Sequence, residues 1–181
     1  MKRIGLILSI GWICFIFYQG TQVGEVSLAK SDFIVTRIMN VIDWWEDHFP
    51  KKEDVPTSSA VETSNQTTPT PPSIDPKVKL QQTLSYVVRK SAHVIEYFTL
   101  GVLLYLTFRT FNVSVTNQSI YALFVVLLCA VLDEYFQSFF DRTSSIGDVL
   151  LDFSGGLVGI TCVGVMLWLV KSSKSKGMKA N

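Results

Sequence analysis

The residues best suited to chemistry are ionisable side chains that interrupt apolar segments. Arg89, His93 and Tyr97 recur at helical spacing, so they form one stripe, with Lys90 and Glu96 beside it. An ionisable residue near the centre of a bilayer costs about 2.5–3.5 kcal/mol on insertion scales. A membrane helix that keeps such residues therefore uses them, either to pair with one another or to bind something.

Two more polar groups lie next to later apolar segments. Asp133 and Gln137 are four residues apart and share a helix face, with Glu134 adjacent. Asp148 and Asp152 repeat that spacing and begin the last apolar segment. Gly155 and Gly159 continue the same face, and such a pair of small residues allows a neighbouring helix to approach closely.

The elements that must position these residues are membrane-spanning helices. The chain has 181 residues, of which 48% are hydrophobic, and its mean hydropathy is +0.32. Apolar runs predict spans over Ile4–Tyr18, Ala92–Phe108, Ser119–Phe136 and Val149–Val170. We expect the first to be an uncleaved span, because no small-x-small cleavage site follows Tyr18. The fold class is therefore all-α integral membrane, a four-transmembrane-helix bundle.

An additional external helix is predicted over Leu28–Phe49, where apolar residues recur at helical spacing between charged ones. It either lies in the membrane surface, with Trp44 and Trp45 at headgroup level, or caps the bundle without touching lipid. The following segment is rich in Pro, Thr and Ser and is predicted to be a disordered linker. The expected organisation is 1–19 first transmembrane helix, 20–50 external segment, 51–82 linker, 83–171 three-helix core and 172–181 basic tail.

The distribution of lysine and arginine predicts the orientation. With Lys2 and Arg3 in the cytoplasm, Arg109 and the lysine-rich tail also fall inside, so we expect both termini to be cytoplasmic. All three polar groups then lie at the outer end of the bundle. We expect an outer-leaflet polar pocket there, and its ligand-binding residues are Lys90, His93, Glu96, Asp133, Glu134, Gln137, Arg142, Asp148 and Asp152.

Simpler interpretations of these residues stay open. Lys90 can extend to the interface, Asp148 can form a capping box with Ser145, and His93 can be a packing residue. The whole set can be a structural salt-bridge network in a non-catalytic structural or assembly protein. His93 and Glu96 with Asp133 or Glu134 have the ligand types of a divalent metal site, so a membrane-embedded metal-dependent hydrolase or transferase is the alternative function.

We nevertheless predict no metal ligands, because one histidine is few for zinc. No catalytic residue and no cofactor is assigned from the sequence. Cys14, Cys129 and Cys162 lie in apolar runs and are expected to form neither a disulfide nor a metal site. The chain lacks a basic patch with interleaved aromatics, so we expect no nucleic acid partner.

The pattern resembles the VanZ-like family of bacterial membrane proteins. The resemblance runs through Arg89-Lys90-x-Ala92-His93-x-x-Glu96-Tyr97-x-x-Leu100-Gly101, then Leu132-Asp133-Glu134-Tyr135-x-Gln137, then Arg142-x-x-x-Ile146-x-Asp148-Val149-x-x-Asp152, then Gly155-Gly156. It implies a four-helix protein of the bacterial cell membrane. The family is named for a member linked to resistance to the glycopeptide teicoplanin, so the resemblance implies a link to such resistance.

The expected partner is a membrane lipid or a lipid-linked cell-wall precursor, bound as an anion. Exposed amides at the start of the fourth span, with Lys90 and Arg142 nearby, are suited to a phosphate or pyrophosphate. Our hypothesis is that Arg142 contacts the phosphate and that Asp148 and Asp152 orient it. The sequence makes no prediction of the oligomeric state.

Overall fold

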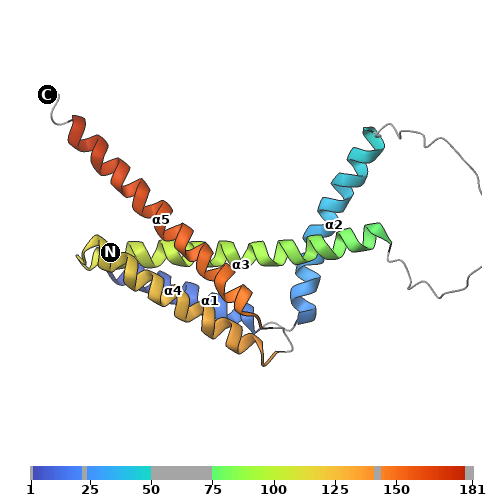
Figure 1. Cartoon of the computed structure of the whole chain (residues 1–181), viewed down its shortest axis with the longest axis horizontal. Coiled ribbons are helices and arrows are strands. Elements are labelled where there is room, and N and C mark those ends of the chain that lie inside the picture. Colours follow the sequence, from blue (N-terminus) through green and yellow to red (C-terminus); the bar gives the residue numbers. More distant parts are fainter. Residues whose placement is uncertain (1, 22–23, 50–74, 141–143, 178–181) are drawn as a thin grey trace, which may run out of the picture. The chain divides into compact units, whose positions relative to one another are not determined.

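The chain folds into helices in a computed structural model, which describes residues 2–21, 24–49, 75–140 and 144–177. The helices are α1 (Lys2–Gly20), α2 (Gly24–His48), α3 (Pro76–Thr110), α4 (Val115–Gln137) and α5 (Ile146–Gly177) (Figure 1). All except α2 are long and apolar enough to cross a membrane. The predicted class, an all-α membrane bundle of four spanning helices, is confirmed for the described part of the chain.

The chain divides into two compact units, and each is described by itself. The core unit contains residues 1–27 and 89–181, and the α2 unit contains residues 28–88. Helix α3 is continuous, so its first part belongs to the α2 unit and the remainder to the core unit. This division does not test the predicted domain boundaries, which stay predictions.

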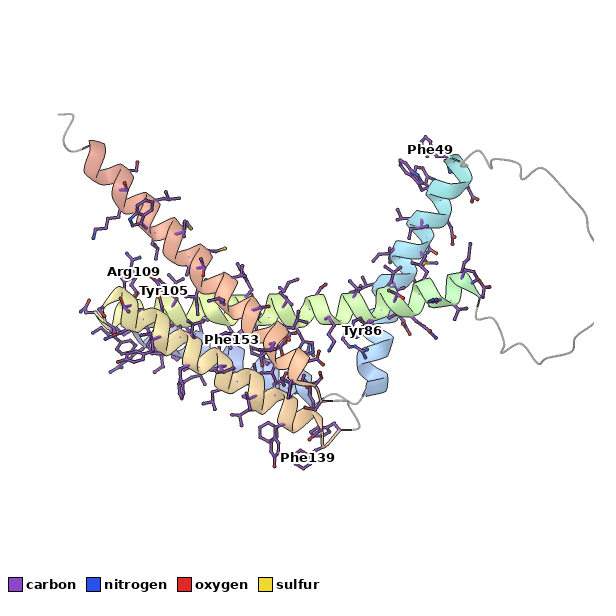
Figure 2. All side chains as sticks on the ribbon, viewed as in Figure 1. Phe49, Tyr86, Tyr105, Arg109, Phe139 and Phe153 are labelled. Atoms are coloured by element: carbon purple, nitrogen blue, oxygen red, sulfur yellow. The ribbon has the colours of Figure 1, made fainter. Side chains whose placement is uncertain are left out.

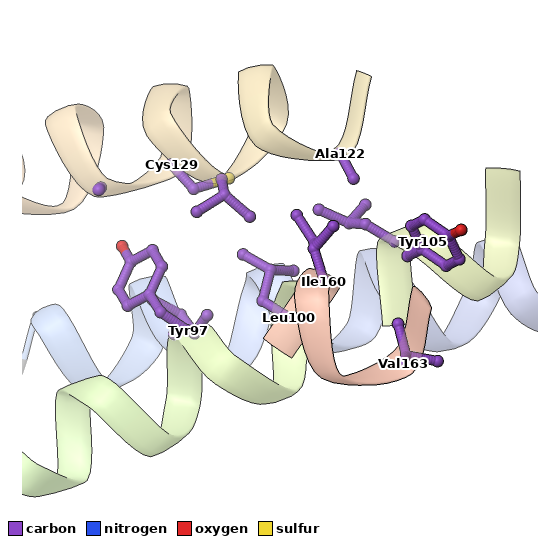
Figure 3. Close-up of a cluster of buried hydrophobic side chains, with 11 residues drawn as sticks. Tyr97, Leu100, Tyr105, Ala122, Cys129, Ile160 and Val163 are labelled. Atoms are coloured by element: carbon purple, nitrogen blue, oxygen red, sulfur yellow. The ribbon is translucent and has the colours of Figure 1, made fainter. Parts of the chain in front are cut away.

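In the core unit, α4 packs against both α5 and α1. The side chains buried between these helices and α3 are apolar, as Figure 3 shows. They are Ile16, Tyr97, Leu100, Leu104, Tyr105, Ala122, Val126, Cys129, Ala130, Ile160 and Val163. Large apolar residues such as Ile7, Phe124 and Trp168 are exposed on the outside. That surface is suited to lipid, in which apolar side chains need no protein cover.

Helices α3 and α5 touch through glycine. A Cβ atom at Gly155 would lie 2.6 Å from the carbonyl oxygen of Val94, and one at Gly159 would clash with the backbone of Phe98. The predicted close approach at this pair of small residues is therefore confirmed. Since Val94 faces Gly155 and Phe98 faces Gly159, the two helices run in the same direction, and their first turns in the core unit lie side by side.

Polar contacts fix α1 on α3. The hydroxyls of Ser9 and Thr107 lie 3.0 Å apart and are buried. The indole nitrogen of Trp12 donates a hydrogen bond of 2.9 Å to the carbonyl oxygen of Glu96. Hydrogen bonds between spanning helices are worth roughly 0.6–2 kcal/mol each. Because Ser9 meets the later residue of α3 and Trp12 the earlier one, α1 is antiparallel to α3.

The α2 unit consists of α2 and the first part of α3. The Ser85 hydroxyl donates to Asp32 at 2.9 Å, and Lys77 forms an exposed ion pair of 3.0 Å with Asp43. The exposed aromatic side chains of α2 include Phe33, Trp44 and Trp45, and the exposed Phe49 directly follows the helix (Figure 2). The helix predicted over Leu28–Phe49 thus exists, and its placement in the membrane surface stays a prediction.

Helix α3 begins earlier than the linker boundary at residue 82 suggests. The carboxylate of Asp75 accepts a hydrogen bond of 2.9 Å from the backbone N–H of Lys77, and Pro76 occupies the first helical position. An acidic cap followed by proline is a strong helix start. Residues 76–82, expected as linker, are therefore helical, and the rest of the predicted linker up to residue 74 lies outside the described residues.

Candidate functional site

Polar side chains from three helices meet where α4 ends and α5 begins. We call them the polar cluster. Its members are Lys90, His93 and Tyr97 from α3, Asp133, Glu134 and Gln137 from α4, and Asp148 and Asp152 from α5. Parallel packing of α3 and α5 and antiparallel passage of α4 bring these ends together, as the sequence hypothesis required.

The centre of the cluster is formed by His93, Asp133 and Asp152. The Nδ1 atom of His93 lies 3.9 Å from Oδ2 of Asp133 and 3.8 Å from Oδ2 of Asp152. The two aspartate side chains are only 1% and 2% exposed, whereas His93 is 16% exposed. Two buried carboxylates thus lie near the same nitrogen of one imidazole, at separations longer than a hydrogen bond.

Further contacts hold Asp133 in place. The side-chain amide of Gln137 donates a hydrogen bond of 2.8 Å to Oδ2 of Asp133, one turn earlier on α4. Gly20, at the end of α1, lies directly against the other carboxylate oxygen, because a Cβ atom there would clash with Oδ1. The absence of a side chain at Gly20 therefore leaves room for the Asp133 carboxylate.

An ion pair forms the edge of the cluster. Lys90 on α3 contacts Oδ1 of Asp148 on α5, and these side chains are 23% and 20% exposed. The interpretation of Lys90 as a residue that only extends to the interface is therefore wrong. Its charge is directed at a carboxylate of the neighbouring helix, so it ties the first turn of α5 to α3.

The start of α5 differs from the capping box considered above. In a capping box the Asp148 side chain would reach back to the N–H of Ser145. That N–H instead donates to Oε2 of Glu134 at 3.0 Å, and Asp148 turns to Lys90. The Ser145 hydroxyl accepts from the Gly147 N–H at 3.1 Å. Glu134 from α4 therefore performs the capping role.

This capping removes one part of the anion hypothesis. The backbone N–H groups of Asp148 and Val149 donate to the carbonyl oxygen of Ser145, and that of Gly147 donates to its hydroxyl. Amides that already have acceptors are poor partners for a phosphate. The expected anion site at the helix start is therefore wrong for these three amides.

Two buried oxygens of the cluster have no hydrogen-bond partner among the described residues. They are Oδ2 of Asp152 and the hydroxyl of Tyr97. The Tyr97 side chain is fully buried and points from α3 toward α4 (Figure 3), within electrostatic reach of Asp133 and Asp152. An unsatisfied buried polar atom costs about 1–3 kcal/mol. Tyr97 was in the predicted stripe but not among the predicted site residues, although its position four residues after His93 was the available signal.

Two predicted members are not assigned to the central group. Glu96 is half-buried on α3, and its backbone carbonyl accepts the hydrogen bond from Trp12. It is not among the residues whose ligand atoms gather around His93. Arg142 lies outside the described residues, so its assignment to phosphate stays a prediction.

A described cavity lies at the opposite end of the core unit. It measures about 510 Å³ and is lined by residues that include Tyr105, Arg109 and Lys171. Tyr105 and Arg109 are seen together near the end of α3 in Figure 2. The residues of the polar cluster do not line this cavity.

Comparison with known protein families gives a match that covers most of the chain. The chain matches the VanZ/LLP1 family over residues 5–169. It belongs to the VanZ/LLP1 family. The match extends beyond the motifs of the sequence resemblance and includes α1, which supplies Gly20 and Trp12. Searches of the curated proteins and of the solved structures each gave no match.

Membership in the VanZ/LLP1 family, together with the four apolar helices, identifies a multi-pass membrane protein of the cell envelope. The polar cluster lies within the region that the family covers. The sequence resemblance to VanZ-like proteins is therefore confirmed.

Proposed function

We propose that the chain binds an anionic, lipid-linked ligand of the bacterial cell envelope at the polar cluster, through a phosphate or pyrophosphate group. The observation that carries this proposal is the pair of buried oxygens on Asp152 and Tyr97 without a hydrogen-bond partner among the described residues. A purely structural network stabilises a bundle when its members are satisfied, and a partly satisfied one is worse than an apolar core. The Tyr97 hydroxyl can donate to a phosphate oxygen, and the Asp152 oxygen needs a donor or a cation that accompanies the phosphate.

The edge of the cluster supports access from the membrane surface. Lys90 and Asp148 keep about a fifth of their side-chain surface exposed, while Asp133 and Asp152 behind them are buried. A lipid headgroup that displaces Asp148 from Lys90 gains a cation, and its tail stays along the apolar outer face of the helices. The orientation predicted from lysine and arginine assigns this edge to the outer leaflet.

The test compares two lipids that share a tail. Purified full-length protein is titrated with a polyprenyl phosphate and with the corresponding polyprenol, and binding is followed by native mass spectrometry. We expect saturable binding of the phosphate and at least tenfold weaker binding of the alcohol. Lys90→Gln should weaken phosphate binding, whereas the matched control Lys77→Gln, which breaks the exposed pair with Asp43, should not. Equal binding of both lipids, or equal loss in both variants, would reject the proposal.

A second candidate function is hydrolysis of a polyprenyl pyrophosphate, and the gathering of His93, Asp133 and Asp152 favours it. One water would split the P–O–P bond to give polyprenyl phosphate and inorganic phosphate. The assay is phosphate release by the purified protein with added Mn²⁺ or Zn²⁺. Release that is lost in Asp152→Asn would support an enzyme, and lipid binding without any release would leave a binding protein.

The link to teicoplanin resistance, which the family resemblance implies, is part of this proposal. A protein that holds a lipid-linked wall precursor can alter how much of it a glycopeptide reaches. Expression of the chain in a susceptible bacterium should raise the inhibitory concentration of teicoplanin, and Lys90→Gln should lower that rise. An unchanged inhibitory concentration with normal membrane abundance would remove the resistance role.

A further inference from the structure

The centre of the polar cluster has the composition and spacing of a metal site. His93, Asp133 and Asp152 each offer one ligand atom, and these atoms all lie within 4.8 Å of one another. They come from three helices, so no two of them are brought together by sequence spacing alone. The group considered from the sequence was His93 and Glu96 with Asp133 or Glu134. In the structure Asp152 takes the place of Glu96, and Glu134 instead accepts the Ser145 N–H.

The distances are those of groups arranged around a common point. Two ligand atoms bound to one ion at about 2.1 Å in a tetrahedral site lie about 3.4 Å apart. The observed distances from His93 Nδ1 to the two carboxylates are 3.9 and 3.8 Å. These two distances exceed the tetrahedral value by about half an ångström, and the three ligand atoms all lie within 4.8 Å of one another, so a small closure would bring them onto one ion. The same distances are too long for hydrogen bonds between the residues.

The charges at this point favour a cation. Asp133 and Asp152 are almost fully buried, and Lys90 contacts Asp148 while its charge also acts on Asp152. Carboxylates taken out of water are costly unless opposite charge and hydrogen bonds compensate them. One divalent ion offsets both carboxylates at once. Oδ2 of Asp152, which has no hydrogen-bond partner among the described residues, would then bind the ion.

We infer that His93, Asp133 and Asp152 bind a divalent transition-metal ion, of the Zn²⁺ or Mn²⁺ type, whose open coordination position receives a phosphate oxygen of the ligand. This inference rests on the proposed function for the identity of the ligand. The imidazole favours Zn²⁺ over Ca²⁺ and Mg²⁺, which prefer oxygen ligands, and the two carboxylates are also suited to Mn²⁺. Three protein ligands leave a position open, as in zinc sites that bind substrate rather than in closed structural ones.

Tyr97 supports the same arrangement from a residue outside the ligand group. Its side chain is fully buried, its hydroxyl has no hydrogen-bond partner among the described residues, and it lies near both aspartates. A phenol in that position can donate a hydrogen bond to a phosphate oxygen bound at the open coordination position. Tyr97 is then a positioning residue for the ligand and not a metal ligand.

The site is also held rigidly enough for a metal. Gly155 and Gly159 bring the backbone of α5 onto α3, which fixes the distance between Asp152 and His93. Gly20 and Gln137 confine the Asp133 carboxylate from two sides. Contacts of this kind, made to metal-binding residues by residues that do not bind the metal, orient the ligands. They commonly contribute 10- to 100-fold to metal affinity.

The experiment measures metal in the full-length protein purified without chelators, before any lipid is added. We expect about one equivalent of Zn²⁺ or Mn²⁺ per chain by elemental analysis, and a Co²⁺ derivative with visible absorption bands. Asp152→Asn keeps the side-chain shape and should weaken Co²⁺ binding at least tenfold, as should His93→Ala. Asp43→Asn, the same change in the α2 unit, should bind as the unmodified protein does. Tyr97→Phe should keep the metal and weaken binding of polyprenyl phosphate.

The outcomes separate this inference from the proposed function. Absence of stoichiometric metal together with no saturable Co²⁺ binding overturns the metal site. Polyprenyl phosphate binding that persists unchanged after chelation also overturns it, while leaving the proposed function intact. A bound metal with equal affinity for the phosphate and the polyprenol keeps the metal site and rejects the proposed ligand. If Asp152→Asn does not accumulate, the Co²⁺ spectrum of the unmodified protein decides, because a tetrahedral site with bound imidazole differs from hydrated Co²⁺.

Discussion

Glu134, near the end of α4, accepts a hydrogen bond of 3.0 Å from the backbone N–H of Ser145, just before α5. The carboxylate is 4% exposed, so this bond is shielded from water. It connects two consecutive spanning helices at the polar cluster, and it fixes where Asp148 and Asp152 begin their face of α5. Glu134, which the sequence predicted as a ligand-binding residue, thus has a structural role in the cluster.

The capping role of Glu134 can be tested by substitution. Glu134→Ala removes the acceptor and should lower the free energy of unfolding in detergent by about 1–3 kcal/mol, because a buried N–H is left unsatisfied. Glu134→Gln keeps an acceptor oxygen and should lose less than half of that. The measurement is thermal or denaturant unfolding of purified variants. An equal loss in both variants would mean that the charge of Glu134 matters and the bond does not.

The glycine contact between α3 and α5 gives a second prediction. Gly159→Ala places a methyl group against the backbone of Phe98, so we expect a loss of stability of about 1–3 kcal/mol from overpacking. Gly11→Ala is the matched control, because nothing lies within 4 Å of its added Cβ. Since alanine is the better helix former, that control should be neutral or stabilising. The contact is unimportant if both variants unfold at the same temperature.

How far the sequence alone predicted this protein depends on the kind of contact. The spans follow from apolar runs, and the close approach at Gly155 and Gly159 follows from small residues on one face, so both were predictable. The partner of each polar residue was not. Asp148 had a local alternative in the capping box, and only the packing of α4 shows that Glu134 takes the Ser145 N–H.

The contact of Gly20 with Asp133 is another contact that the sequence could not predict. A glycine at the end of an apolar span carries no signal that it faces a carboxylate on α4. The replacement of Glu96 by Asp152 in the central group also depends on helix rotation, which periodicity defines only to within a residue or so. The convergence of three helices was predictable, whereas the atoms that meet there were not.

Arg142 provides a prediction for a residue outside the described part of the chain. If its guanidinium contacts the ligand phosphate, Arg142→Ala should weaken polyprenyl phosphate binding at least tenfold. Membrane abundance and the unfolding temperature should stay near those of the unmodified protein. A variant that fails to accumulate or unfolds early would instead make Arg142 a structural counter-ion.

The orientation of the chain is tested by cysteine labelling in intact cells. Ser58→Cys should react with a membrane-impermeant maleimide, and Ser175→Cys should react only after the cells are opened, because lysine and arginine predict cytoplasmic termini. Cys14, Cys129 and Cys162 are changed to alanine first to remove background labelling. Labelling at Ser175→Cys but not at Ser58→Cys would invert the orientation and assign the polar cluster to the inner leaflet.

The most direct test of the central claim is to locate a bound lipid phosphate on the protein. A polyprenyl phosphate with a photoreactive group next to the phosphate is crosslinked to the full-length protein, and the modified residues are identified by mass spectrometry. The account predicts crosslinks within residues 86–97 and 144–156, around Lys90 and Asp148, that excess polyprenyl phosphate removes and polyprenol does not. Crosslinks that gather instead around Arg109 and Lys171, at the cavity of the opposite end, would contradict it.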